Sequence, residues 1–443
     1  MESIYVGIDV SKGYADIKII DKNQETVVSS FRLSDTAKGR EELGARLLSL
    51  LPESAANIYC GVESTGGYEN NWYRHLRSIS PRIYVTRINP KCVKSNGEAE
   101  LVRTTTDAVS AQMIATYMVR FEGNSHYFNS DTVVDERFYE GRKLNRYVEQ
   151  LNKQKTVFNN QLEKVLYEYM PSVINLSRNG VPKWVLNVLR KHSSPKKLVK
   201  MGTKRLGRLH GVGEERASKL LSGIKKGVLQ CPETASRLIA KLSNKILSLE
   251  GEIKEERKYL ENTYGDLPGI ELLTSIVGIG TQSAVELILE IEDITRFSTA
   301  KQLCSYFGLH PVFKQSGDGV FKNRMSKKGR STVRRVLYMC CLTSIKYSPM
   351  MKALYARQKA NGKNHYQSIG VLMHKMLRVI FGVLNSQKAY SEAIDEQIRS
   401  KAETARKETV TKQDEFELEL EATAPISRRK AQKIKKQADV PIE

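Results

Sequence analysis

Short runs of alternating apolar and polar residues fill the first part of the chain, and this pattern is typical of strands. The runs within residues 3–32 are separated by turn signals at Lys12-Gly13 and Lys22-Asn23. Further strands are expected at 57–63 and 82–88, and helices at 36–50, near 69–79 and from Asp107 onward. Three strands and a helix, followed by strand, helix, strand and helix, predict an α/β domain with a mixed sheet.

Beyond residue 135 the apolar spacing changes to alternating fours and threes, which predicts coiled-coil helices. One seam runs through Leu144, Val148, Leu151, Lys155, Phe158, Leu162, Val165 and Tyr169. A second runs through Ile239, Leu242, Ile246, Leu249, Ile253, Glu256 and Leu260. We expect these helices to pack on each other as an antiparallel arm, or on a second subunit. Short helices are expected between them, at 181–228.

The remaining chain divides into a mostly helical region, 267–385, and a highly charged stretch from about 389 that is poor in large apolar residues. This stretch, with "RRKAQKIKK" at 428–436, is expected to be a solvated or disordered tail that contacts nucleic acid. The predicted domains are therefore 1–125, 130–265 and 266–388, with 389–443 as the tail. The sequences "GVG" (211–213) and "GIG" (278–280) each resemble half of a helix–hairpin–helix, although a tight turn between packed helices explains either equally well.

A formal net charge of +22 indicates a polyanionic partner, and nucleic acid fits better than a surface charged only for solubility. The chain has no run of eighteen apolar residues and no secretion-signal pattern, so neither a membrane span nor secretion is predicted. Its six cysteines form no CxxC pair and no zinc-like grouping, which favours reduced thiols in the cytosol.

Three acidic residues of the first domain form a candidate site. Asp9 and Glu63 each end an apolar strand, and Asp107 begins a helix. Taken singly, they could be a turn residue, a surface residue and a helix cap. Packed together they would repel one another unless a cation lay between them, and Mg²⁺ or Mn²⁺ suits an all-oxygen site. Two such ions can activate a nucleophile and stabilise a leaving oxygen in phosphodiester chemistry.

A basic loop forms the second candidate site. Between Lys314 and Arg335 there are eight lysines and arginines and a single acid, Asp318. Gly317, Gly319 and Gly329 would let the backbone approach a ligand, and Ser331 is expected to cap the following helix. The candidate phosphate contacts are Lys314, Lys322, Arg324, Lys327, Lys328, Arg330, Arg334 and Arg335. A solvated basic loop is the simpler alternative.

The order "GIDVSK", "VESTGGY", "INPKCVK" and "TTTDAVSAQMIA" resembles the bacterial insertion-sequence transposases with a DEDD catalytic set, a family that includes pilin-gene-inverting recombinases. The resemblance implies a ribonuclease H-like, resolvase-like first domain with Asp9, Glu63 and Asp107 as metal ligands. Ser110 stands where the family has its fourth acid. A water could fill the gap, the site could be weakened, or the residue has been changed.

The same resemblance assigns a nucleophile in the C-terminal domain. "GLHPVFKQSG" matches the family's serine motif and places the nucleophile on Ser316, with Ser326 and Ser331 as local competitors. The implied mechanism joins Ser316 covalently to a DNA phosphate, assisted by carboxylates from the same or another subunit. Some relatives use a structured guide RNA, and synapsis of two DNA sites implies a homodimer or homotetramer. A cytoplasmic, nucleoid-associated protein is expected. The alternatives are a metal-dependent junction resolvase or nuclease, and a nucleic-acid-binding regulator with a decayed site.

Overall fold

The computed structural model describes residues 3–51, 57–64, 66–101, 106–121, 136–177, 180–226, 230–312, 315–316, 319–320, 324–393 and 396–397, with the backbone alone at 315–316 and 319–320. The chain divides into two compact units, Met1–Val133 and Val134–Glu443. Each is described by itself. The predicted boundaries of the four smaller regions stay predictions.

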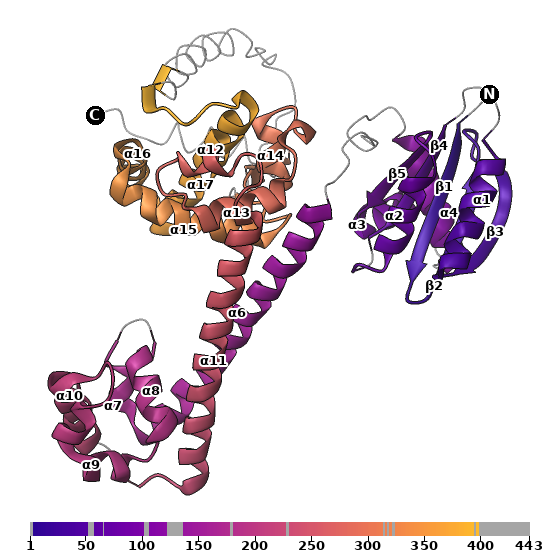
Figure 1. Ribbon diagram of the computed structural model, residues 1–443. Coiled ribbons are helices and arrows are strands. Elements are labelled where there is room, and N and C mark those ends of the chain that lie inside the picture. Colours follow the sequence, from indigo (N-terminus) through magenta and orange to yellow (C-terminus); the bar gives the residue numbers. More distant parts are fainter. Residues whose placement is uncertain are drawn as a thin grey trace, which may run out of the picture. The chain divides into compact units, whose positions relative to one another are not determined.

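The first unit is built on a five-stranded mixed sheet (Figure 1). Its strands are β1 (Ile4–Ser11), β2 (Tyr14–Ile20), β3 (Thr26–Ser34), β4 (Ile58–Glu63) and β5 (Ile83–Ile88). The order across the sheet is β3-β2-β1-β4-β5. β2 is antiparallel to both of its neighbours, whereas β1, β4 and β5 are parallel. The mixed sheet predicted from the alternating pattern is confirmed.

Helices cover both faces of this sheet. α1 (Ala37–Ser49) and α2 (Glu69–Ile79) pack on the face formed by Val6, Ile8 and Val10 of β1. α3 (Pro90–Ala99) and α4 (Asp107–Arg120) pack on the face formed by Tyr5 and its neighbours. The sequence pattern did not predict α3. The missed signals were Asn89, which caps the helix, and Pro90 at its first position.

The second unit contains a long antiparallel helix pair, α6 (Glu136–Tyr169) and α11 (Glu233–Tyr264), visible in Figure 1. Arg137 pairs with Asp266, and Lys155 pairs with Glu250 at 3.5 Å, so the two sequences run in opposite directions. Lys155 is the residue that interrupts the predicted apolar seam. Its ion pair with Glu250 shows why a charge is tolerated there.

A small bundle connects the two long helices. It consists of α7 (Pro171–Ile174), α8 (Lys183–Lys191), α9 (Pro195–Gly207) and α10 (Gly213–Lys225). α9 is kinked at Gly202, whose φ is 73°. The bundle packs on the adjoining ends of α6 and α11 around its own apolar cluster, which includes Leu189, Leu198 and Leu221.

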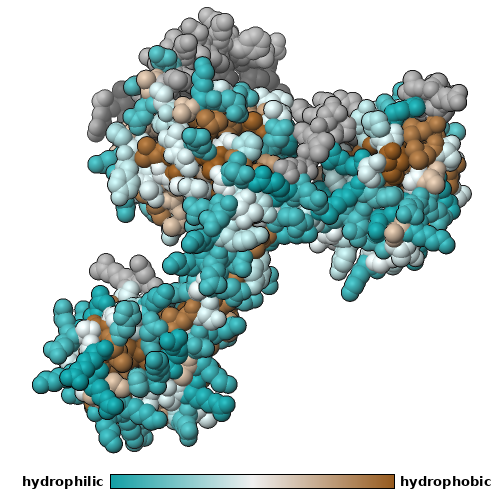
Figure 2. Space-filling view, viewed as in Figure 1, coloured by the Kyte–Doolittle hydropathy of each residue, from teal (hydrophilic) through white to brown (hydrophobic). Residues whose placement is uncertain are grey.

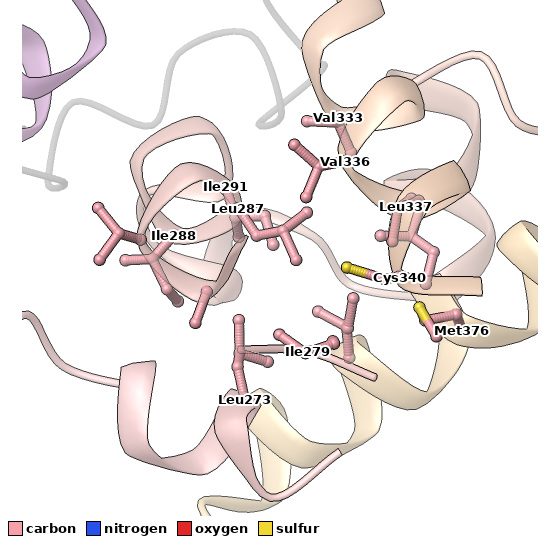
Figure 3. Packing of buried hydrophobic residues seen from close by; sticks show 14 of the residues in the cluster. Leu273, Ile279, Leu287, Ile288, Ile291, Val333, Val336, Leu337, Cys340 and Met376 are labelled. Carbon is pink, nitrogen blue, oxygen red and sulfur yellow. The ribbon is translucent and has the colours of Figure 1, made fainter. Parts of the chain in front are cut away.

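The C-terminal part of this unit is mostly helical. Its helices are α12 (Ile270–Thr274), α13 (Thr281–Ile291), the short 3₁₀ helix η1 (Ile294–Arg296), α14 (Ala300–Tyr306), α15 (Ser331–Tyr347), α16 (Pro349–Ala360) and α17 (His365–Ser386). Figure 3 shows Leu287 of α13 near Val336 of α15, with Met376 of α17 in the same core. α15 begins at Ser331 itself. Arg330 is its N-cap residue and makes no side-chain capping bond, so the predicted Ser331 cap is wrong by one position.

Among the described residues, α17 is long and apolar enough to cross a membrane by length and composition. However, 56% of its most apolar window is buried inside the unit. The core helix of a soluble protein has the same properties, so this is only weak evidence for a membrane span.

Candidate active site

The strand register brings acidic residues of the first unit into one row. Asp9 of β1 lies opposite Asp16 of β2, which lies opposite Arg32 of β3. On the other side of β1, Ile8 is paired with Val62, so Glu63 lies next to Asp9. Because directly opposed residues point to the same face of a sheet, this row lies on the side covered by α4.

α4 approaches β1 closely enough to bring its first turn to this row. A Cβ on Gly7 would lie 1.9 Å from the backbone oxygen of Ala111, so only glycine permits this packing. Thr106 caps α4 by accepting a hydrogen bond from the backbone N–H of Val109 at 3.3 Å. Asp107 is thus the first helical residue and is not the cap, which leaves its carboxylate available for other contacts.

The pKa of Asp9 shows that the acids of this row interact electrostatically. The pKa of Asp9 is raised to about 6, first by burial and then by the charges of Glu63, Asp107 and Asp16, and a hydrogen bond from Ser110 opposes this shift. Burial also raises the pKa of Glu63. The structure therefore brings the four sequence-predicted positions of the first unit into one electrostatic neighbourhood. Ser110, one turn after Asp107 on α4, interacts with Asp9.

Three further residues belong to this neighbourhood and were missed from the sequence. Arg32 binds Asp16 through two hydrogen bonds, of 2.9 and 3.2 Å, and reaches Asp107 at 3.0 Å. Tyr14 donates a hydrogen bond to Asp107 at 3.3 Å, and the Arg32 guanidinium stacks over its ring. An acid at an inward-facing position of β2 was the available signal, but its partner on β3 could be found only from the register.

The fit of a metal ion to this site is mixed. Among the described residues no group of three or more His, Cys, Asp or Glu side chains is arranged to hold a metal. The donor set is nevertheless suitable, because neighbouring carboxylates repel one another and raise the pKa of Asp9. A divalent cation between them would offset this repulsion and stabilise their charged forms. Asp107 is paired with Arg32, so a cation that takes Asp107 as a ligand has to compete with this guanidinium.

Ser316 lies in a short β-hairpin between α14 and α15. β6 (Pro311–Val312) pairs with β9 (Arg324–Met325), and further out β7 (Gln315–Ser316) pairs with β8 (Gly319–Val320). Ser316 lies opposite Gly319 in the outer pair. The basic loop predicted from composition is therefore partly a hairpin, with Ser316 in its outer pair of strands.

The base of this hairpin explains Gly329. Its φ is 115°, and a Cβ on it would lie 2.2 Å from the backbone oxygen of Tyr306. Gly308, on the other side of the base, comes equally close to the backbone of Lys328. The close approach predicted for Gly329 thus serves the chain's own backbone and not a ligand. Gly317 lies outside the described residues.

The predicted phosphate contacts fall into three groups. Arg324, Lys327 and Lys328 are exposed around the hairpin base. Lys314 and Lys322 lie outside the described residues. The other three predicted contacts, Arg330, Arg334 and Arg335, have partners within the protein.

Arg330 and Arg335 pair with acids on α13. Arg330 contacts Glu290, which is 1% exposed, and Arg335 contacts Glu286 at 2.6 Å and Glu149 of α6 at 3.5 Å. Arg334 donates to backbone oxygens, including that of Phe307 at 2.9 Å. These arginines hold α15 against its neighbours. The sequence signal was a pair of acids four residues apart within the apolar α13.

Comparisons with known proteins match both candidate regions. A family model described as a DEDD transposase of the IS110 type matches residues 6–171, and the transposase IS116/IS110/IS902 family model matches residues 270–356. The first match contains the acidic row and Ser110. The second contains Ser316 and the hairpin.

Individual relatives agree with these matches. The chain is 22% identical over 408 residues to an uncharacterized insertion element IS116 protein of Streptomyces clavuligerus, covering 88% of this chain and 97% of the relative. It is 26% identical over 297 residues to an uncharacterized insertion element IS110 protein of Streptomyces coelicolor, covering 64% and 72%. It is 31% identical over 127 residues to the pilin gene-inverting protein of Moraxella bovis, covering 28% and 39%.

Proposed function

The chain belongs to the IS116/IS110/IS902 family of transposases and is a DNA transposase or recombinase, and we propose that it cuts and rejoins DNA through an intermediate linked to Ser316. In this proposal Asp9, Glu63 and Asp107 hold the divalent cation that the family indicates, Mg²⁺ or Mn²⁺. The observation that carries the proposal is the convergence of these acids, with Ser110, on Asp9. The sheet order β3-β2-β1-β4-β5 with an antiparallel β2 supports a ribonuclease H-like first domain.

The proposed chemistry is a transesterification that needs no external energy source. The Ser316 oxygen loses its proton and forms a bond to phosphorus, the bond from phosphorus to a sugar oxygen breaks, and that oxygen takes up a proton and leaves as a hydroxyl. Attack by a second DNA hydroxyl then restores the serine and joins the strands. A cation held by the three acids would stabilise negative charge on the phosphate oxygens.

The exposed cations around the hairpin suit the binding of DNA beside Ser316. Arg324, Lys327 and Lys328 could contact phosphates on either side of the scissile bond. The Arg330, Arg334 and Arg335 side chains contribute mainly by fixing α15, which follows directly on the hairpin.

The test of the proposal is the covalent adduct itself. Ser316→Ala should abolish protein–DNA adducts on denaturing gels, because no other group is assigned as nucleophile. Ser331→Ala is the matched control, since it removes a nearby hydroxyl at the start of α15 and should leave adducts intact. Adducts that persist in Ser316→Ala would exclude this serine.

A metal-dependent nuclease is the second candidate, because the acidic row lies within one compact unit and contains no residue of the hairpin. Strand cleavage that survives Ser316→Ala but is lost in Asp9→Asn would favour it. The ion pair between Arg32 and Asp107 favours the third candidate, a regulator with a weakened site. Tight DNA binding without cleavage or joining in Mg²⁺ would support that function.

The remaining partners are proposals drawn from the resemblance to this family. We propose a homodimer or homotetramer in the cytoplasm, associated with the nucleoid, with a structured guide RNA as a further partner. Sequencing the nucleic acid that co-purifies with the protein would test the RNA, and light scattering with and without DNA would test the subunit number.

A further inference from the structure

The bundle α7–α10 lies between the two family matches, which end at residue 171 and resume at residue 270. It has its own apolar core and contains neither the acidic row nor Ser316. The proposed chemistry therefore gives it no role.

The surface of this bundle is strongly basic. Residues 183–226 contain thirteen lysines and arginines against two acids, a formal excess of eleven out of the chain's +22. All thirteen side chains are exposed. Within the described part of the chain, no ion pair joins any of them to a carboxylate, in contrast to Arg330 and Arg335. Most of this surface is hydrophilic in Figure 2.

The turn between helices that precedes α10 has the same sequence pattern as the turn that precedes α13. In each, a Gly-x-Gly turn is followed four residues later by a fully buried alanine, Ala217 or Ala284. The two turns differ in the atoms that lie beside their glycines. A Cβ on Gly278 would lie 2.1 Å from the Ser344 hydroxyl of α15, whereas a Cβ on Gly211 or Gly213 would meet nothing within 4 Å.

Packing explains the glycine in the turn before α13 but does not explain the glycines in the open turn before α10. Gly278 is required because α15 lies against it, which supports the tight-turn interpretation of "GIG". Gly211 and Gly213 have φ values of 77° and 73° and face open space. Lys204, Arg205 and Arg208 immediately precede this open turn and are exposed.

We propose that the basic surface of α8–α10, centred on the open turn at 211–213, binds the phosphate backbone of duplex DNA without reading its sequence. Charge complementarity identifies the partner as a polyanion. An open glycine turn lets the main chain come close to a phosphate that flanking cations hold. The surface thus anchors DNA away from the site of strand exchange.

The side-chain chemistry of the bundle favours a duplex over other polyanions. Proteins that bind single strands stack bases on exposed aromatic rings, and membrane-binding surfaces insert apolar side chains. Within residues 180–226, all of which are described, no large hydrophobic residue is exposed. A predominantly cationic surface without exposed large hydrophobic side chains suits the backbone of a double helix.

The experiment compares two triple variants of the full-length protein. Lys204→Ala/Arg205→Ala/Arg208→Ala removes three charges beside the open turn. Lys352→Ala/Arg357→Ala/Lys359→Ala removes three exposed charges on α16. The two sets are matched, because each includes two basic residues in the last turn of a helix. Thermal unfolding establishes that both variants fold.

Fluorescence anisotropy with a random-sequence DNA duplex, over a series of KCl concentrations, gives the result. We expect the first variant to lose roughly tenfold in affinity and the slope of log K against log salt to become shallower by about 2 to 3. The α16 variant should change much less. Equal effects of the two triples, or none, would overturn the proposal.

A structured RNA hairpin in the same titration separates the two nucleic acids. A loss of affinity for the RNA with unchanged DNA binding would also overturn the proposal. This inference rests on the proposed function only in taking DNA as the partner. Ser316→Ala should retain the full salt slope, so failure of the covalent chemistry and failure of this surface are distinguishable.

Discussion

At the scale of single residues, the candidate site is a balance of charges around Asp9. The residues predicted from the sequence, Glu63, Asp107 and Ser110, all act on this carboxylate. Their convergence follows from motifs at strand ends and a helix start. Arg32 could not be predicted, because its place beside Asp16 depends on the pairing of β2 with β3.

Ser110→Asp tests how the missing acid affects the site. In chelator the new carboxylate should lower the thermal midpoint, because it adds repulsion to a group whose pKa is already raised to about 6. In Mg²⁺ it should tighten cation binding by about fivefold or more, the equivalent of about 1 kcal/mol. Calorimetric titration measures this affinity. Ser110→Asn is the neutral control, and equal affinity in both variants would place residue 110 outside the metal shell.

His374 on α17 makes the stability of the second unit depend on pH. Burial lowers its pKa below 6.5, and Arg378 and His310 lower it further. As the pH falls below about 6.5, the unfolded chain takes up a proton that the folded unit does not bind. Stability should therefore decrease as the pH falls through this range. Urea unfolding at about pH 7.5 and 5.5 should show a smaller difference in His374→Gln. An unchanged difference would assign the pH effect to other groups.

At the scale of elements, the strands and most helices follow from the apolar pattern, but the partners of charged residues do not. In the sequence, Arg330, Arg334 and Arg335 belong to the same basic stretch as Arg324. In the structure the first three hold α15 in place, because Glu286 and Glu290 are buried on a neighbouring helix distant in sequence. Composition shows how many charges a segment has but not which of them are neutralised.

Replacing Arg330 and Arg324 separately distinguishes these roles. Arg330→Ala leaves the buried Glu290 without its cation and should destabilise the second unit by about 3 kcal/mol. Arg324→Ala removes an exposed side chain and should change stability by less than about 0.5 kcal/mol. It should instead make the salt slope of DNA binding shallower by about 1. Urea unfolding and anisotropy titrations measure both effects, and a stable Arg330→Ala protein that has lost DNA affinity would reverse the assignment.

At the scale of the whole molecule, the chain consists of two units with separate cores and an uneven distribution of charge. The composition predicted a nucleic-acid partner, and the family matches agree with it. Composition did not show that half of the net charge lies on one small bundle, because its cations are spread over three helices and become one surface only on folding.

The two-unit organisation makes cation binding visible in unfolding. If Mg²⁺ binds to Asp9, Glu63 and Asp107, it should raise the unfolding midpoint of the first unit alone. At a hundredfold excess of Mg²⁺ over Kd, the free energy of unfolding of this unit should increase by about 2.7 kcal/mol. Scanning calorimetry with and without Mg²⁺ measures this shift. Asp9→Asn should remove it. A shift confined to the second unit would show that the cation binds elsewhere.

The antiparallel pairing of α6 and α11 has a consequence for how this protein can vary. Since Lys155 of α6 lies beside Glu250 of α11, the two ends of the segment between them are neighbours across the helix pair. The segment between these two residues, which includes the bundle α7–α10, therefore begins and ends at adjacent positions. It can be shortened, exchanged or lost in one genetic event while the remaining helices keep their pairing, so the anchoring of DNA and the chemistry on DNA can evolve separately.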